Sequence, residues 1–292
     1  MHPNAQNHCM VIFKKIADLQ KYLSTQTEQK NTIGFVPTMG ALHNGHRSLV
    51  EKARADGNVV VCSIFVNPTQ FNDKSDFEKY PVSIEKDIEI LIEAGCDVLF
   101  LPSVNEIYPD GTEKVQTFDF GYLDTILEGE KRPGHFRGVG QVVGRLLDIV
   151  DPQYLYLGQK DYQQCMVIRR LIEIKGKQPQ IQLVICPIIR EADGLAMSSR
   201  NRRLTEPQRA IACTLYQCLV SIQSKQNSGS FDVARKECID LLNEKGFVPD
   251  YVALADARDL TVLNNYDQNR PMIALVAARI GEIRLIDNLL LN

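Results

Sequence analysis

The 292-residue sequence contains no tryptophan, only five histidines and no excess of basic residues. Lysine and arginine together number 33 and aspartate and glutamate 36, so the net charge is −3. A chain without a basic surplus is a poor candidate for binding nucleic acid along its phosphates, although a local basic pocket for a small anion is compatible with this charge. We therefore predict small-molecule partners and no nucleic acid.

The eight cysteines form no C-x-x-C pair, and several lie in apolar runs such as VVVCSIFV and QLVICP. Scattered thiols of this kind are typical of buried, reduced cysteines in a cytosolic protein, and they argue against disulfides or a zinc site. The N-terminal stretch MHPNAQNHCMVIFKK lacks the pattern of a signal peptide, and no apolar run approaches the roughly 20 residues that cross a bilayer. The sequence predicts a cytoplasmic protein with no membrane partner.

Strand-like and helix-like segments alternate over the first two-thirds of the chain. The predicted strands are Thr32–Val36, Asn58–Val66, Asp97–Leu101, Tyr154–Leu157 and Gln182–Cys186. The predicted helices between them include 84–94, 139–150 and 162–174, and the first of these has Ser83 as a plausible N-cap and Gly95 at its end. Such alternation predicts right-handed crossovers and a parallel sheet.

The pattern changes near residue 200, and we place the domain boundary near residue 195. Thr205–Gln208 fits a capping box, and two helices are expected at about 206–226 and 231–245. The later segments DYVALADA and PMIALVAARIGEIRLID have the composition of strands without long crossovers. We therefore predict an α/β fold with two domains: a Rossmann-like parallel-sheet domain at residues 1–195 and a smaller α+β lid domain at 196–292.

The segment PTMGALHNGH (Pro37–His46) follows the first predicted strand and places two histidines three residues apart. Open α/β sheets bind ligands at the carboxyl ends of their strands, and a helix N-terminus there favours phosphate. His43 and His46 would project to the same side of the helix and could donate hydrogen bonds to phosphate oxygens. A metal site would need further ligands, and no His/Cys cluster supplies them. Taken alone, H-x-G-H fits a helix-capping turn equally well.

PTMGALHNGH and FVNPTQF (Phe65–Phe71) together resemble the nucleotide-binding edge of pantothenate synthetases. These enzymes belong to the H-x-G-H nucleotidyltransferase superfamily, which is related to class I aminoacyl-tRNA synthetases. The likeness continues in the family's order through RPGHFRGV, LGQKDYQQ, READGLAMSSRN and AARIGEIRLIDN. Several motifs of eight or more positions in one order make a chance match implausible, so the chain is identified as a member of this family.

The resemblance implies an AMP-forming carbon–nitrogen ligase that makes pantothenate, on the route to coenzyme A. The carboxylate of pantoate would attack the α-phosphorus of ATP, and β-alanine would then displace AMP from pantoyl adenylate. It also implies a requirement for Mg²⁺, with ligands that stay unknown, and a homodimer formed through the N-terminal domain. The alternatives are a nucleotidyltransferase of the same superfamily acting on another small substrate, and a non-catalytic nucleotide-binding module.

The resemblance also assigns catalytic and ATP-binding roles. It makes His46 the proton donor and adds His43 and Lys160 as catalytic residues. A lysine at a strand end can act as a compact positive charge on the phosphates. The implied ATP-binding residues are Met39, Gly40, Ala41, Leu42, His43, Asn44, Gly45, His46, Gly158, Gln159, Lys160, Asp161, Ile189, Met197, Ser198, Ser199 and Arg200.

The same resemblance points to the substrate contacts. Gln70 and Gln164 are expected to bind pantoate, because a glutamine both donates and accepts hydrogen bonds. Asn67 is a further candidate near β-alanine or phosphate. The segment Met197–Arg200 looks like the counterpart of the synthetase loop that closes over the triphosphate.

The roles of two residues stay open. Asp161 either orients Lys160, binds the ribose or caps the next helix. His135 either faces the nucleotide or packs within its loop. The chain also departs from the family at Val82, where an arginine is usual, which puts any charge contact of that segment in doubt.

Overall fold

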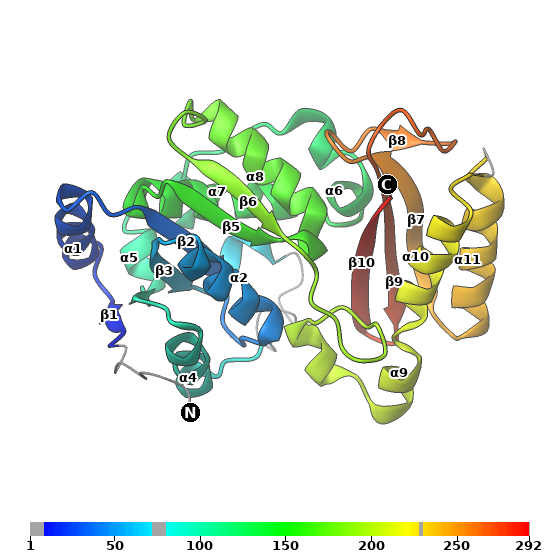
Figure 1. Ribbon diagram of the computed structural model, residues 1–292, viewed down its shortest axis with the longest axis horizontal. Coiled ribbons are helices and arrows are strands. Elements are labelled where there is room, and N and C mark those ends of the chain that lie inside the picture. Colours follow the sequence, from blue (N-terminus) through cyan, green and yellow to red (C-terminus); the bar gives the residue numbers. More distant parts are fainter. Residues whose placement is uncertain (1–8, 72–79, 228–229, 292) are drawn as a thin grey trace. The chain divides into compact units, whose positions relative to one another are not determined.

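The computed structural model describes residues 9–71, 80–227 and 230–291 (Figure 1). The chain forms two compact units, Met1–Gly158 with Val167–Cys186 and Gln159–Met166 with Pro187–Asn292. The short segment 159–166 groups with the C-terminal residues. The domain ranges 1–195 and 196–292 stay a prediction.

The first unit is built on a six-stranded parallel sheet with strand order β1-β4-β3-β2-β5-β6. Its strands are β1 (Val11–Phe13), β2 (Ile33–Thr38), β3 (Val59–Ile64), β4 (Val98–Phe100), β5 (Tyr154–Gly158) and β6 (Gln182–Cys186). Strand β2 pairs with β3 on one side and β5 on the other, so the strand order reverses there. Ligands of open α/β sheets bind at such a switch point. The predicted parallel α/β sheet is confirmed.

Helices connect the strands of this sheet along the chain (Figure 1). They are α1 (Ile16–Glu28), α2 (Asn44–Ala55), α4 (Ile84–Ala94), α5 (Val104–Ile107), α6 (Leu127–Lys131), α7 (His135–Val150) and α8 (Tyr162–Ile174), with 3-10 turns η1 (Pro68–Gln70), η2 (Thr112–Lys114) and η3 (Gly121–Asp124). Helix α4 ends, as predicted, at Gly95 in the left-handed conformation with φ 80°. Apolar residues of α2, α4 and strands β2 to β4 form one buried core.

Strand β1 and helix α1 lie outside the segments that the sequence predicts. The strand has only three residues, and Val11 and Ile12 are exposed. Helix α1 buries only Leu19 and Leu23, so its apolar stripe is narrow. A short edge strand and a weakly amphipathic helix carry too little periodicity to be recognised without their neighbours.

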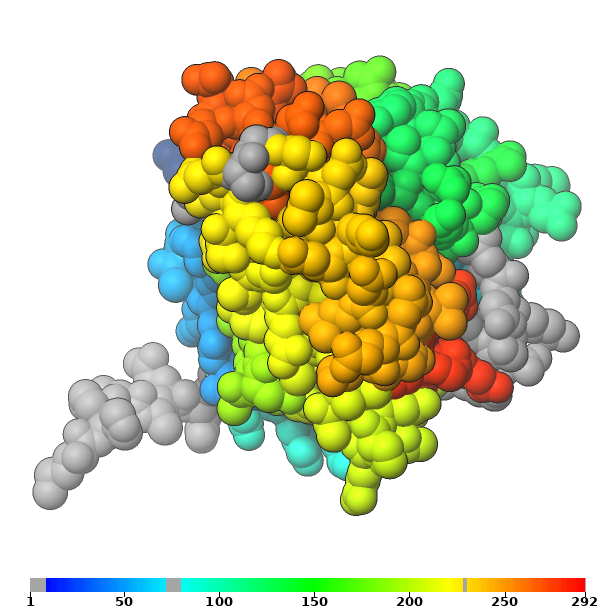
Figure 2. Space-filling model, turned by 90° about the vertical axis from the view of Figure 1, so that its right-hand side faces the viewer, coloured from blue at the N-terminus to red at the C-terminus, as the bar shows by residue number. Residues whose placement is uncertain are grey.

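The second unit contains a four-stranded antiparallel sheet with order β10-β9-β7-β8. Its elements are η4 (Gln159–Asp161), η5 (Ser199–Arg203), α9 (Glu206–Ile211), α10 (Thr214–Ser224), α11 (Asp232–Glu244), β7 (Val248–Asp256), β8 (Val262–Leu263), β9 (Met272–Ile280) and β10 (Ile283–Leu291). Helices α10 and α11 pack on the sheet and enclose an apolar core, and Figure 2 shows these two helices from outside (yellow and gold). The predicted α+β character is confirmed.

The single helix predicted at 206–226 is wrong, because the structure has two helices there, α9 and α10. The predicted capping box at Thr205 is present and starts α9. Helix α9 ends where the Ala212 N–H bonds to the carbonyl of Arg209, three residues back. The Thr214 hydroxyl then donates to the carbonyl of Ile211 at 2.7 Å. A side-chain hydroxyl that occupies a helix carbonyl competes with the next turn.

Within residues 9–71, 80–227 and 230–291, no helix is long and apolar enough to span a membrane. All eight cysteines are free thiols, and six of them are buried. Burial raises the pKa of Cys96 to about 12 and that of Cys186 to about 11. Neither thiol is therefore a nucleophile at neutral pH.

Candidate active site

The loop between β2 and α2 carries the H-x-G-H motif and has an unusual backbone. Gly40 and Ala41 both adopt the left-handed conformation, with φ 80° and 49°. This conformation turns the N–H groups of Ala41 and Leu42 toward Asp87 of α4, whose two carboxylate oxygens accept them at 2.9 and 2.8 Å. Asp87 is 1% exposed and also accepts the hydroxyl of Ser83 at 3.0 Å. A buried carboxylate from another helix therefore fixes the loop.

His43 and His46 lie together at the start of α2, with ring centroids 4.1 Å apart. His43 is the N-cap, and its Nδ1 accepts the backbone N–H of Gly45 at 3.1 Å. A neutral ring with an accepting Nδ1 carries its proton on Nε2, so Nε2 is its donor. The predicted capping role and the predicted pairing of the two rings are thus both present.

Gln70 lies in η1, the turn that follows β3. The Gln70 amide Nε2 contacts Sδ of Met39 at 3.1 Å, so the H-x-G-H loop and this turn meet within the first unit. Asn67 caps η1 and is fully buried. Its Oδ1 accepts the hydroxyl of Tyr108 at 2.9 Å, and its Nδ2 donates to the carbonyl of Gly138 at 3.2 Å.

Helix α7 packs closely against this turn. A Cβ atom on Gly138 would overlap the backbone of Thr69, so only glycine allows this approach. His135 is buried, and its Nδ1 lies 2.9 Å from the carbonyl oxygen of Gln70 while its Nε2 lies 3.0 Å from Arg132. His135, the first residue of α7, therefore packs against the turn that carries Gln70.

The GQKD segment begins at Gly158, the last residue of β5, and its residues 159–161 form the turn η4 of the second unit. The Lys160 side chain is only 17% exposed, and its Nζ lies 3.7 Å from Oδ2 of Asp161. Asp161 is half exposed and lies close enough to orient the ammonium group. Gln164 follows in the first turn of α8 and is partly buried.

The predicted phosphate-binding segment Met197–Arg200 is a structured turn. The Met197 N–H bonds to the carbonyl of Ile189 at 3.0 Å, and the Ser198 hydroxyl caps η5 by accepting the N–H of Arg200 at 3.3 Å. Ser199 is buried at 8% exposure. The backbone of this segment is therefore preset by hydrogen bonds of its own.

The predicted site residues divide between the two units. The first unit contains Met39, Gly40, Ala41, Leu42, His43, Asn44, Gly45, His46, Asn67, Gln70 and Gly158, and the second contains Gln159, Lys160, Asp161, Gln164, Ile189, Met197, Ser198, Ser199 and Arg200. Each unit thus holds its own share of the predicted residues.

The described part of the chain holds no group of three or more His, Cys, Asp or Glu side chains arranged to bind a metal ion. The two carboxylate oxygens of Asp87 already accept two backbone N–H groups and a hydroxyl. This carboxylate holds the loop in place.

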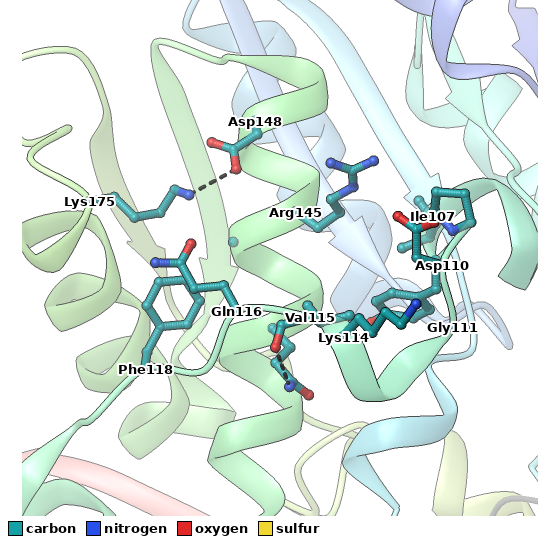
Figure 3. A pocket seen from close by; sticks show the side chains of 14 residues that line it. Ile107, Asp110, Gly111, Lys114, Val115, Gln116, Phe118, Arg145, Asp148 and Lys175 are labelled. Atoms are coloured by element: carbon teal, nitrogen blue, oxygen red, sulfur yellow. Dashed lines mark hydrogen bonds and ion pairs between the residues drawn. The ribbon is translucent and has the colours of Figure 1, made fainter.

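A separate pocket of about 220 Å³ lies in the first unit (Figure 3). Phe118, Arg145, Asp148 and Lys175 are among its lining residues, and none of the predicted site residues lines it. Lys175 pairs with Asp148 at 2.9 Å and lies 5.7 Å from the ring centroid of Phe118. Part of the charge on its walls is therefore already compensated.

An open parallel sheet with an H-x-G-H turn at its switch point defines an α/β protein of the nucleotide-binding class. The family model described as pantoate-beta-alanine ligase matches residues 11–290. The chain belongs to this family.

Relatives of the chain span nearly its whole length. It is 43% identical over 285 residues to the pantothenate synthetase of Cytophaga hutchinsonii, a match that covers 97% of this chain and 99% of that protein. The crystal structure of pantothenate synthetase from Thermus thermophilus has a TM-score of 0.88 at 40% identity and covers 96% of this chain and 99% of that one. A Francisella tularensis pantoate-beta-alanine ligase, solved with beta-gamma ATP and beta-alanine, has a TM-score of 0.80 at 39% identity and covers 97% and 98%.

Proposed function

We propose that this protein joins pantoate to β-alanine in two steps that use ATP. In the first step a pantoate carboxylate oxygen bonds to the α-phosphorus of ATP, and the bond from that phosphorus to pyrophosphate breaks. In the second step the amine of β-alanine attacks the acyl carbon of pantoyl adenylate, loses a proton and displaces AMP. The observation that carries the proposal is the H-x-G-H turn held by Asp87 at the switch point of a sheet in this family's fold.

The first step needs donors more than it needs covalent chemistry, because negative charge spreads over the phosphate oxygens as the bond changes. His46 and Nε2 of His43 supply such donors, and the N-terminus of α2 adds a favourable helix dipole. In this proposal His46 is the proton donor to the departing pyrophosphate. His43 orients the nucleotide and keeps its tautomer through the Gly45 N–H.

Lys160 is the proposed positive charge on the phosphates in the same step, with Asp161 orienting its ammonium group. The turn Ser198–Arg200 is proposed to contribute hydroxyl and guanidinium donors. The remaining ATP-binding residues predicted from the sequence are proposed to line the nucleotide site. A positioned charge in a site that excludes water contributes far more than the same charge in water.

Gln70 and Gln164 are proposed to bind pantoate through its hydroxyls and carboxylate. Asn67 has no exposed surface, so we propose that it acts by fixing the turn that carries Gln70. Its contact with Oε1 of Gln70, at 3.3 Å, supports this role.

The described residues do not fit a magnesium site built only from protein side chains, because no carboxylate cluster is present among them. Mg²⁺ commonly keeps several waters and binds through substrate phosphates. We propose that Mg²⁺ arrives with ATP and partly neutralises its triphosphate. We also propose a cytoplasmic location and a homodimer formed through the N-terminal domain, which analytical ultracentrifugation would detect as a species of twice the mass.

The test of the function is exchange of labelled pyrophosphate into ATP, measured with pantoate and Mg²⁺ but without β-alanine. We expect exchange that depends on pantoate, followed by AMP and pantothenate once β-alanine is added. A stable nucleotide-linked product that ignores β-alanine would favour the alternative nucleotidyltransferase. ATP binding without any release of pyrophosphate, also with all three substrates present, would contradict both enzymes.

A further inference from the structure

The segment RLIDN (Arg284–Asn288) carries part of the family resemblance, but its sequence suggests no role. It lies in β10, which pairs antiparallel with β9 (Figure 1). Asp287 and Asn288 are only 4% and 2% exposed, although both are polar. Buried polar side chains cost free energy unless they find partners, so their partners indicate what they do.

Among the described residues, the side-chain amide of Asn288 makes all of its hydrogen bonds with the turn η4. Its Nδ2 donates to the carbonyl oxygens of Gln159 and Lys160, both at 2.9 Å. Its Oδ1 accepts Nε2 of Gln159 at 3.1 Å. One amide side chain therefore satisfies two consecutive backbone carbonyls and closes a ring of hydrogen bonds with Gln159.

These two carbonyls belong to the peptide groups on either side of the Lys160 Cα. Because each peptide group is planar, holding both of them fixes the two backbone dihedrals of Lys160. The direction of its Cα–Cβ bond is then fixed as well. The contact therefore acts on the direction in which the lysine side chain leaves the backbone.

Asn288 is itself held on both sides. Asp287 accepts the N–H of Asn288 at 2.8 Å, and Arg190 donates to the Asn288 carbonyl at 3.2 Å. Arg190 also binds Asp287 in a bidentate pair, at 2.6 and 3.0 Å, and lies over the ring of Tyr216 at 4.0 Å. Burial raises the pKa of Asp287, whereas the charges of Arg190 and Lys160 oppose this rise.

We propose that Asn288 is a positioning residue for Lys160, and that this is the role of the RLIDN segment. The inference rests on the proposed function of Lys160 as the charge that acts on the phosphates. Without the amide, both peptide groups of the turn lose their donors and can rotate. The ammonium group then samples several directions, and the rate of adenylate formation falls because positioning is lost.

A double-mutant cycle tests this coupling. Asn288→Asp keeps the volume of the side chain but sets a carboxylate against two carbonyl oxygens, so both donor bonds are lost. We expect this variant to lower kcat for pantoate-dependent pyrophosphate exchange by about 10- to 100-fold, with little change in KM for pantoate. In a Lys160→Ala background the same change should lower kcat by less than about 3-fold, because there is no ammonium group left to position. Equal losses in both backgrounds would overturn the proposal.

Thr214→Val is the matched control. Thr214 is also buried in the second unit, at 2% exposure, and its hydroxyl donates to one backbone carbonyl in α9. We expect it to shift the urea midpoint of unfolding but to leave kcat unchanged in both backgrounds. If it lowered kcat as much as Asn288→Asp does, general destabilisation would explain both results and the proposal would fail.

A second measurement does not depend on activity. Reductive methylation of lysines, followed by peptide mass spectrometry, reports how readily each amine is reached. Lys160 is mostly buried in the native protein, and Asn288→Asp should speed its labelling several-fold relative to the exposed Lys236 of α11. An unchanged ratio would overturn the proposal even if the wild-type chain showed no exchange, an outcome that would refute the proposed function separately.

Discussion

The two turns that carry the proposed catalytic residues are held in opposite ways. The H-x-G-H loop has left-handed residues at Gly40 and Ala41, and its N–H groups are accepted by the carboxylate of Asp87. The turn η4 has no positive φ at any of its residues, and its carbonyl groups are bound by the amide of Asn288. In both turns a single buried side chain from a distant segment satisfies two consecutive peptide groups.

The difference shows that the backbone groups facing inward determine which side chain can hold the turn. A loop that turns its N–H groups inward needs an acceptor with two oxygens, and aspartate supplies them. A turn that directs its carbonyls inward needs two donors on one group, and asparagine supplies those. The Asp87 contact carries a charge and the Asn288 contact does not.

The largest effects on turnover are expected from replacing Lys160 and His46, the proposed catalytic residues of the two turns. Lys160→Ala or His46→Ala should lower the turnover of pantothenate formation by about 100- to 1,000-fold, the scale of losing one donor to the charge of a transition state. The measurement is steady-state turnover with all three substrates. Lys236→Ala removes an exposed lysine on α11 and serves as the control, with unchanged turnover expected. Near-normal turnover in both active-site variants would refute the assigned roles.

The next largest effect is expected at Asp87. Asp87→Ala leaves two buried N–H groups without an acceptor and should lower the free energy of unfolding by about 3 kcal/mol. Asp87→Asn keeps one acceptor oxygen and should lose less. Urea denaturation measures both, and Ser83→Ala is the control because it removes only a hydroxyl donor to the same carboxylate. If both Asp87 variants were as stable as the wild type, the H-x-G-H loop would keep its conformation without the Asp87 carboxylate.

Glycine is required in only one of the two turns, and Gly40→Ala tests this. A methyl group at Gly40 meets a positive φ and also lies 3.0 Å from Oδ2 of Asp87 and 3.1 Å from Cγ2 of Ile64. We expect a loss of about 2 kcal/mol in the free energy of unfolding. Gly57 has φ 83° and open space around it, so Gly57→Ala should cost about 1 kcal/mol for the backbone alone. Equal losses of unfolding free energy in Gly40→Ala and Gly57→Ala would show that the close contact of the methyl group with Asp87 adds no cost.

The smallest effect concerns pH. Asp256, in the second unit, has a pKa lowered to about 2, chiefly by hydrogen bonds from the Arg258 side chain. A lowered carboxyl pKa stabilises the fold above the pKa of the unfolded chain, about 3.9, and this stability is lost as the pH falls toward 2. Because Arg258 is largely exposed, we expect only about 1 kcal/mol.

The measurement compares the wild type with Asp256→Asn by urea denaturation at pH 5, 4 and 3. Their difference in the free energy of unfolding should shrink as the pH falls, and Asp259→Asn, an exposed neighbour, controls for the loss of one charge. A difference that stays constant would contradict the ion-pair explanation. The contact of Asn288 with η4 joins an amide to two carbonyl groups, none of which titrates.

Much of the fold follows from local pattern. Alternating apolar segments predict the parallel sheet, and Gly95 and Thr205 mark helix ends at the correct residues. The split between α9 and α10 could not be predicted in this way, because it depends on the Thr214 hydroxyl reaching the carbonyl of Ile211. The motifs of the predicted site could be read from the sequence, since each is a short run of residues with its own chemistry.

The side chains that hold those motifs in place could not be assigned from the sequence. Asp87 interrupts the apolar stripe of α4 and Asn288 lies in an apolar strand, so the sequence does show that each is out of place. Neither signal identifies a partner, because the contacts join residues 45 or more positions apart. By itself the sequence determined the family, the reaction class and the residues proposed to face the substrates. Only the tertiary structure decided which buried side chains hold the two turns, because hydrogen bonds between distant segments leave no local periodicity in the chain.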